Sequence, residues 1–216
     1  MHKRKMFRIK EMEDHISKDI RQQEYRLRSR DAGELDENIR GYEDLVMYNL
    51  EAGEAVLTKD NDVDIFIDGN EKFRALMEDL RNAEHFIKDI LIEKAAQGVE
   101  VRVLFDAMGC RSVRHSYWKW LNEKGVQTAE FFPAILRRLQ LRINYRNHRK
   151  IVVIDNKVAY VGGFNVGKEY IDLDEKFGHW RDTHLRIRGS AVLGLQVRFI
   201  LDWNYAAGEN LFLRPE

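Results

Sequence analysis

Apolar and polar residues follow two different periods along this chain, and the change between them separates helices from strands. Between residues 6 and 27 the apolar positions recur at helical spacing and are flanked by Lys and Arg, which predicts an amphipathic helix. From about residue 56 onward, a period of two residues predicts strands and a period of about 3.6 predicts helices. The predicted strands are residues 63–67, 99–105, 126–132, 150–155, 158–161 and 183–187.

The helices predicted between these strands include one that is unusually long. From Phe73 the apolar positions keep a helical period up to Gly98, which predicts a single helix of about 28 residues, or roughly 42 Å. Asn70 stands where its side chain can cap the start of this helix. The other predicted helices contain Tyr117, Trp118 and Leu121, ending at Gly125, and run from a Ser190 cap to about Trp203.

The order of these elements predicts the fold class. Residues 150–155 and 158–161 form a predicted hairpin across Asn156 and Lys157. Strands that alternate with helices, together with a hairpin, predict an α/β fold in which a mixed β-sheet is flanked by helices, after an N-terminal helical extension. The predicted domains are a helical segment at residues 1–55, a catalytic domain at residues 56–206 and a tail at residues 207–216.

The N-terminal segment leaves several interpretations open. The helix predicted at residues 6–27 suits a membrane surface or a partner protein, and it equally suits covering its own domain. The charged residues between positions 31 and 54 are mostly acidic, and this segment predicts a short helix or a connector. No apolar run approaches the roughly 18 to 20 residues that span a bilayer, and no signal-peptide core follows the basic start.

Composition and charge narrow the functional classes. The 216 residues, 44% hydrophobic and 33% charged, are enough for one well-buried core. Lys plus Arg equals Asp plus Glu at 36 each, so no overall positive field favours nucleic acid as a substrate. Charge is nevertheless uneven, because Arg and Lys are the only charged residues between positions 133 and 154. A single Cys110 excludes an intrachain disulfide and a metal site built from several thiolates.

The segment Asn147-His148-Arg149-Lys150, followed by Ile-Val-Val-Ile and Asp155, carries the candidate chemistry. In a strand, His148 and Lys150 project from the same face, whereas Asp155 projects from the other. A phosphodiester repels anionic nucleophiles, so its cleavage without a metal needs a neutral nucleophile and cations on the non-bridging oxygens. His148 and Lys150 meet these two needs, because imidazole is substantially neutral near pH 7 and lysine is a cation.

Two further segments supply partners for this pair. Gly162-Gly163-Phe164-Asn165 offers backbone at Gly163 that can approach a phosphate closely, and an Asn165 amide that donates without adding charge. Asp182, in Trp-Arg-Asp-Thr-His, is the candidate carboxylate that orients the His148 ring. His184 in the same run is a candidate supporting residue behind the site.

These residues match a known pattern. His-x-Lys-x4-Asp at residues 148–155, followed by Gly-Gly-x-Asn at residues 162–165, resembles the phospholipase D superfamily. The longer runs at residues 142–150, 160–165 and 180–184 resemble the bacterial cardiolipin synthases of that superfamily. Most of residues 56–205 take part in the resemblance, and residues 1–55 look like the cytoplasmic segment that follows the membrane anchors of such enzymes.

The resemblance implies a mechanism and a setting. His148 would attack phosphorus to give a phosphatidyl-histidine intermediate, Lys150, Asn165 and Gly163 would hold the phosphate, and Asp155 would support the site. Two phosphatidylglycerol molecules would then give cardiolipin and glycerol, in phospholipid biosynthesis at the cytoplasmic face of the bacterial cell membrane. The resemblance implies no metal and no organic cofactor.

The chain departs from this family in three respects. It holds one His-x-Lys-x4-Asp motif where such enzymes carry two, it lacks their amino-terminal membrane helices, and between Phe86 and Ile90 it lacks an expected buried strand and loop. Three hypotheses follow. The first is an amino-terminal half-enzyme, either a fragment or a chain that needs a partner to supply the second motif. The second is a single-motif homodimer that cleaves DNA or another phosphodiester, and the third is a non-catalytic membrane or partner-binding remnant.

Overall fold

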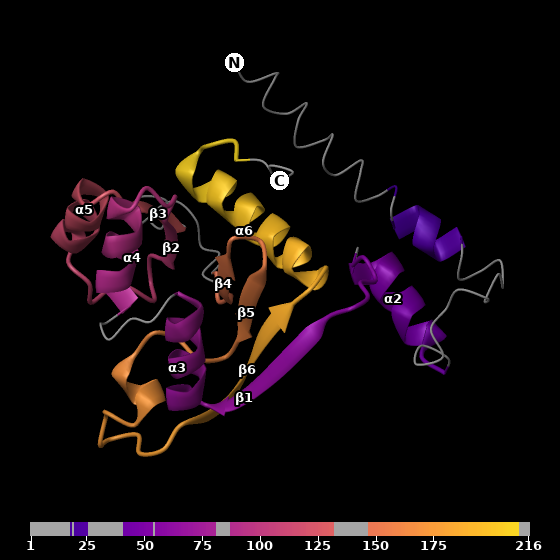
Figure 1. Cartoon of the computed structure of the whole chain (residues 1–216), viewed down its shortest axis with the longest axis horizontal. Coiled ribbons are helices and arrows are strands. Elements are labelled where there is room, and N and C mark those ends of the chain that lie inside the picture. The colour runs from indigo at the N-terminus through magenta and orange to yellow at the C-terminus, as the bar shows by residue number, and fades with distance from the viewer. Residues whose placement is uncertain are drawn as a thin grey trace. The chain divides into compact units, whose positions relative to one another are not determined.

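Two units make up the chain, residues 1–60 and residues 61–216. The computed structural model describes residues 18, 20–25, 41–53, 55–80, 87–131 and 147–211 (Figure 1). In the first unit, residues 20–25 are helical, and the rest of the helix predicted at residues 6–27 falls largely outside the described residues. The acidic stretch contains helix α2, Glu43–Gly53, in which Leu50 is fully buried. The Gln23 amide holds the backbone of Leu57 through two hydrogen bonds of 2.8 and 2.9 Å.

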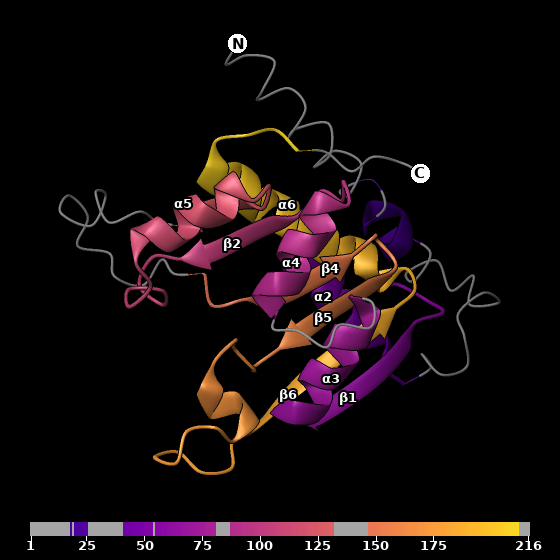
Figure 2. The ribbon, with the colours of Figure 1, turned by 60° about the vertical axis from the view of Figure 1, so that its left-hand side comes forward.

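The second unit contains two sheets, and the strand predictions are confirmed with small changes at the ends. The larger sheet is antiparallel throughout, and its strands lie in the order β1, β6, β5, β4 (Figure 2). The smaller sheet pairs β2 with β3 in parallel. Antiparallel and parallel pairings therefore belong to separate sheets. The strands are β1 Asp62–Asp68, β2 Arg102–Asp106, β3 Gln127–Phe131, β4 Lys150–Ile154, β5 Val158–Gly162 and β6 Arg181–Arg188.

The single long helix of the sequence prediction is wrong. Helix α3, Gly69–Asp79, ends with Leu80 as its C-cap, and helix α4, Ile87–Ala96, begins seven residues later. The apolar period continues across residues 80–87, so the pattern alone did not reveal the end of α3. The remaining helices are α5 His115–Glu123, the 3₁₀ helix η3 Lys168–Ile171 and α6 Ala191–Ala207.

The predicted cap of α3 is also corrected. Asp68, not Asn70, is the N-cap, because its carboxylate accepts a hydrogen bond of 3.0 Å from the Glu71 N–H. Asp68 has the extended backbone of a strand end, with φ of −122°, whereas Asn70 already lies inside the helix. The Asn70 amide donates instead to Asp172, at 3.2 Å.

Helix α6 packs against both sheets (Figure 1). It contacts β3 of the smaller sheet and β4, β5 and β6 of the larger one. Ser190 stands at the predicted N-cap position, but its side chain makes no capping hydrogen bond to the helix, and Trp203 is buried. Helices α4 and α5 pack against a hydrophobic core formed by Val101, Leu121 and Val126.

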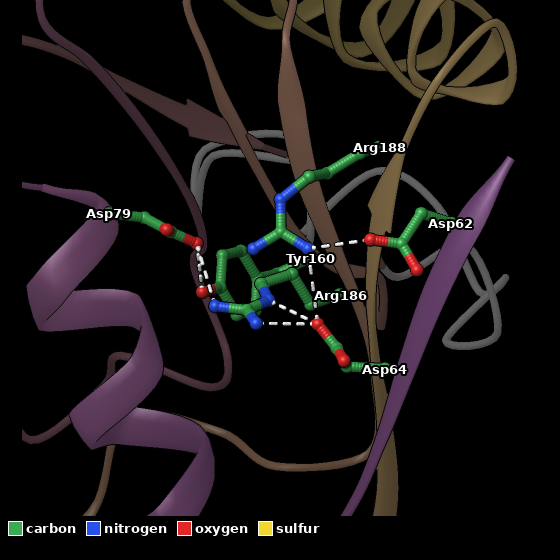
Figure 3. Close-up of polar contacts among 6 residues, drawn as sticks. All are labelled: Asp62, Asp64, Asp79, Tyr160, Arg186 and Arg188. Atoms are coloured by element: carbon green, nitrogen blue, oxygen red, sulfur yellow. Dashed lines mark hydrogen bonds and ion pairs between the residues drawn. The ribbon is translucent and has the colours of Figure 1, made fainter.

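A polar network fixes the edge strand β1 and helix α3 to the centre of the larger sheet (Figure 3). Arg186 of β6 contacts Asp64 of β1 at 2.5 and 2.6 Å and Asp79 of α3 at 3.6 Å. The buried Tyr160 hydroxyl of β5 donates to Asp79, and Arg188 contacts Asp62 and Asp64. Hydrogen bonding from Arg186 lowers the pKa of Asp64, and burial with the Asp79 charge raises the pKa of Tyr160. The network therefore favours ionised Asp64 beside a protonated Tyr160.

Removing the Tyr160 hydroxyl tests this network. We expect Tyr160→Phe to lower the free energy of unfolding by about 1.5–3 kcal/mol, because a buried hydrogen bond to a charged group is lost. Urea denaturation followed by circular dichroism measures the change. Tyr205→Phe is the control, since Tyr205 is 64% exposed and should stay within about 0.5 kcal/mol. Equal midpoints for both variants would show that the network does not stabilise the fold.

Candidate active site

The β4–β5 hairpin carries the His148 motif at one end. His148 is exposed and lies two residues before β4, and Lys150 is the first residue of the strand. The Lys150 Nζ donates to the carbonyl oxygen of His148 at 2.8 Å. Ammonium and imidazole thus belong to one short segment, and the ammonium lies against the backbone of the proposed nucleophile.

Asp155 lies at the opposite end of β4. It forms the hairpin turn with Asn156, and both residues have positive φ, 48° and 52°, as a tight hairpin turn requires. The Lys157 N–H closes the turn on the carbonyl oxygen of Ile154 at 3.0 Å. The structure therefore places Asp155 away from Lys150, where its side chain is exposed and its contribution is to the turn.

Strand register brings the other predicted residues together. Lys150 of β4 lies opposite Gly162 of β5, and Gly162 lies opposite His184 of β6. The start of β4, the end of β5 and the start of β6 therefore meet at one end of the sheet. His148, Lys150, Gly163, Asn165 and Asp182 all belong to these three strand ends.

The two adjacent glycines are required by backbone and side-chain atoms of β6. A Cβ on Gly162 would lie 2.4 Å from the His184 Cα and 2.7 Å from its Cγ. A Cβ on Gly163 would lie 1.9 Å from the Asp182 Oδ1. Any larger residue would therefore displace His184 or Asp182. The Gly163 N–H donates to the Thr183 carbonyl oxygen at 2.8 Å, so a phosphate contact from this group would have to share that bond.

Asn165 and Asp182 are each held by a neighbour. The Asn165 Nδ2 donates to the Tyr170 hydroxyl at 2.7 Å, and Tyr170 is buried in η3. The ring of Tyr170 packs edge-on against Phe164 and Trp180, which orders this loop. Asp182 Oδ1 accepts from the Thr183 N–H at 2.7 Å. Both predicted side chains therefore have defined positions at the sheet end.

His184 lies in the core behind these residues. Its imidazole is 1% exposed, and neither ring nitrogen has a hydrogen-bond partner among the described residues. Burial, reinforced by the nearby Lys72 charge, lowers the pKa of His184 to about 4. Burial likewise lowers the pKa of Lys72, on the inner face of α3, to about 8. A neutral imidazole packed beside Phe164 and Tyr160 is the result.

Sequence reasoning missed several residues that surround the motif. Tyr170, Lys72, Asp106 and Asp202 were not predicted, although Asp106 and Asp202 both bond to Asn147. Their positions in sequence are 41 and 55 residues away from Asn147, so no local pattern connects them. The one sequence signal at Asp202 is that an acidic residue stands within an otherwise apolar predicted helix.

One group among the described residues has the composition of a metal site. Donor atoms of Asp68, Asp172 and His179 lie within 4.8 Å of one another, and the His179 Nδ1 is 3.2 Å from Asp172. The cluster is largely exposed, and Asp68 already caps α3. It adjoins β1 and includes none of the residues predicted to bind phosphate.

Substituting a crowded and an uncrowded glycine by alanine tests whether β5 and β6 approach too closely for a side chain at Gly162. We expect Gly162→Ala to destabilise the protein by about 2–3 kcal/mol, because its Cβ collides with backbone atoms of β6. Gly194→Ala is the matched control, since nothing lies within 4 Å of a Cβ at this helical position. That variant should be neutral or up to about 1 kcal/mol more stable. Chemical denaturation measures both, and equal effects would contradict the steric account.

The buried imidazole predicts a pH dependence of stability. The folded pKa of about 4 lies below the ordinary 6.5, so between these values the unfolded chain binds a proton that the folded chain does not. Stability should therefore fall by about 2–3 kcal/mol as pH drops from 7 to 4 through this group. A His184→Gln variant should lose that part of the dependence. Denaturation midpoints at several pH values compare the two, and parallel curves would refute the prediction.

Comparison with known proteins shows the family of this chain. Residues 57–178 match the family model described as the phospholipase D-like domain of cardiolipin synthase. The major cardiolipin synthase ClsA of Bacillus subtilis is 47% identical over 180 residues, which are 76% of this chain and 37% of that protein. The cardiolipin synthase of Oceanobacillus iheyensis is 46% identical over 191 residues, 81% of this chain and 40% of that protein. The chain thus spans about two fifths of the length of these relatives.

A solved structure supports the fold alone. NucT from Helicobacter pylori superposes with a TM-score of 0.52 at 14% sequence identity, over 68% of this chain and 98% of that chain. At this identity the likeness concerns architecture, and it carries no residue of the site from one protein to the other.

Proposed function

Because the chain belongs to the cardiolipin synthase family of phospholipase D-like domains, we propose that it takes part in phosphatidyl transfer from phosphatidylglycerol, with His148 as the nucleophile. The observation that carries the proposal is the register of β4, β5 and β6. It gathers His148, Lys150, Asn165 and Asp182 at one end of a sheet in a chain 47% identical to a cardiolipin synthase.

In the first step, a nitrogen of the neutral His148 ring attacks the phosphorus of phosphatidylglycerol. A P–N bond forms while the P–O bond to the terminal glycerol breaks, and the product is a phosphatidyl-histidine. Lys150 can turn its ammonium from the His148 carbonyl oxygen to a non-bridging phosphate oxygen, where developing charge is stabilised. The Asn165 amide donates to a second oxygen from its position beside Tyr170.

In the second step, the primary hydroxyl of another phosphatidylglycerol attacks the same phosphorus. The P–N bond breaks, cardiolipin forms, and His148 is regenerated. The departing glycerol of the first step needs a proton, and the hydroxyl of the second step must lose one. We propose that a second His-x-Lys-x4-Asp half, or a second copy of this one, supplies this acid and base.

The setting of the reaction follows from its lipid substrate. No helix in the described part of the chain is long and apolar enough to cross a membrane. We propose peripheral contact with the cytoplasmic face of the bacterial membrane. Arg149, whose side chain is 45% exposed beside His148, would then face anionic headgroups.

An assay on lipid vesicles tests the proposed activity. The purified chain, with and without a complementary half, is incubated with phosphatidylglycerol vesicles in chelator, and cardiolipin is measured by mass spectrometry. We expect His148→Ala to lower the rate at least about 10³-fold and Lys150→Met about 10²- to 10³-fold. His179→Ala, at an exposed histidine outside the proposed machinery, should keep the wild-type rate.

The same preparation is tested on plasmid DNA. Nicking that depends on His148, in place of cardiolipin formation, would replace the lipid proposal with a nuclease. A folded chain that makes no cardiolipin in either arrangement would refute the proposed function.

A further inference from the structure

One buried carboxylate holds the residues on both sides of His148. Asp202 of α6 is 4% exposed. Its Oδ2 accepts hydrogen bonds from the Asn147 Nδ2 at 3.1 Å and from the Arg149 Nη1 at 3.0 Å. Arg198, one turn earlier on α6, donates to the other oxygen. The two residues that flank the proposed nucleophile are thereby fastened to a helix that packs on both sheets.

Asn147 is held by more than this one bond. Its backbone N–H donates to the Asp106 Oδ2 at the end of β2, at 3.2 Å, and its side-chain oxygen accepts from the Arg149 N–H at 3.1 Å. The His148 backbone therefore lies between two residues whose positions are set by α6 and β2. The His148 side chain itself remains exposed. Such a segment has little freedom to move while its imidazole stays free to react.

Charge around Asp202 is compatible with a nearby phosphate. A bare carboxylate next to an anionic substrate would repel it, but Arg149 and Arg198 both contact Asp202. The ion pairs also satisfy the acceptor oxygens of a carboxylate that burial would otherwise penalise. Asp202 can thus fasten the segment without placing net negative charge at the site.

We propose that Asp202 is a positioning residue for His148: through Asn147 and Arg149 it holds the nucleophile on its line of attack at phosphorus. The role in catalysis rests on the proposed phosphatidyl transfer. The fastening of the segment does not, because it concerns the free protein. An error of about 1 Å in the placement of a reacting group can cost about 100-fold in rate.

The test compares Asp202→Asn with Asp79→Asn in the whole chain. Asp79 is the matched control, because it is a half-buried helix aspartate that accepts a hydrogen bond from Tyr160 and forms an ion pair with Arg186 at 3.6 Å. Among the contacts of the described residues, none joins it to the His148 segment. Both substitutions remove a charged acceptor and should lower stability. Only Asp202→Asn should speed amide hydrogen exchange in a peptide covering residues 147–150, by about tenfold or more. It should also lower kcat for phosphatidylglycerol by about 10- to 100-fold with KM changed less than about threefold.

A second variant guards against a folding failure of Asp202→Asn. Asn147→Ala removes the same bond from the half-buried end and should speed exchange and lower kcat in the same direction. Unchanged exchange at residues 147–150, or faster exchange with unchanged kcat, would overturn the proposal. Wild-type protein without transferase activity would instead refute the proposed function. The exchange comparison would still decide whether Asp202 fastens the segment.

Discussion

Backbone pairing of β5 with β4 on one side and with β6 on the other is the constraint on which the candidate site depends. Lys150, Gly162 and His184 occupy one row across these strands, so side chains from three separate parts of the chain meet at one sheet end. β5 and β6 can pair at this row only because Gly162 has no side chain, since a Cβ there would overlap the His184 backbone. Gly163 serves the same purpose for Asp182. A shift of one residue in this register would turn Lys150 to the other face of the sheet and separate it from its partners.

The sheet face that carries this row is unusually polar for a core. Arg186 lies between Asp64 and Asp79, Tyr160 donates to Asp79, and His184 and Lys72 are buried close by. Burying such groups costs free energy unless they are paired or neutral. The arginine is paired, whereas the imidazole is held neutral by a lowered pKa. The arrangement connects α3 and β1 to β5 and β6, the two strands that pair at the centre of the larger sheet.

Helix α6 joins what strand pairing leaves separate. β4 is an edge of the larger sheet, and among the described residues no strand pairs with its outer side or connects it to β2. The apolar side chains of β4 and β2 are accordingly only partly buried. Contacts of α6 with both sheets, and the bonds from Asn147 to Asp202 and Asp106, hold the start of β4 in place. These hydrogen bonds to Asp202 and Asp106 position the start of β4, as backbone pairing would do in a continuous sheet.

The strands, the β4–β5 hairpin and the residues that identify the family could all be predicted from the amino-acid sequence. Each has a local sequence signal. Alternating apolar residues indicate the strands, Asn156 indicates the turn, and the spacing of His148 and Lys150 belongs to the family motif. Tertiary packing sets the end of α3 near Leu80 and makes Asp68 rather than Asn70 its cap. It buries His184 with no hydrogen-bond partner among the described residues. It also decided that Asp202 reaches Asn147 across 55 residues. Side-chain periodicity reports only on near neighbours, whereas register, burial and long-range hydrogen bonds depend on which distant segments pack together.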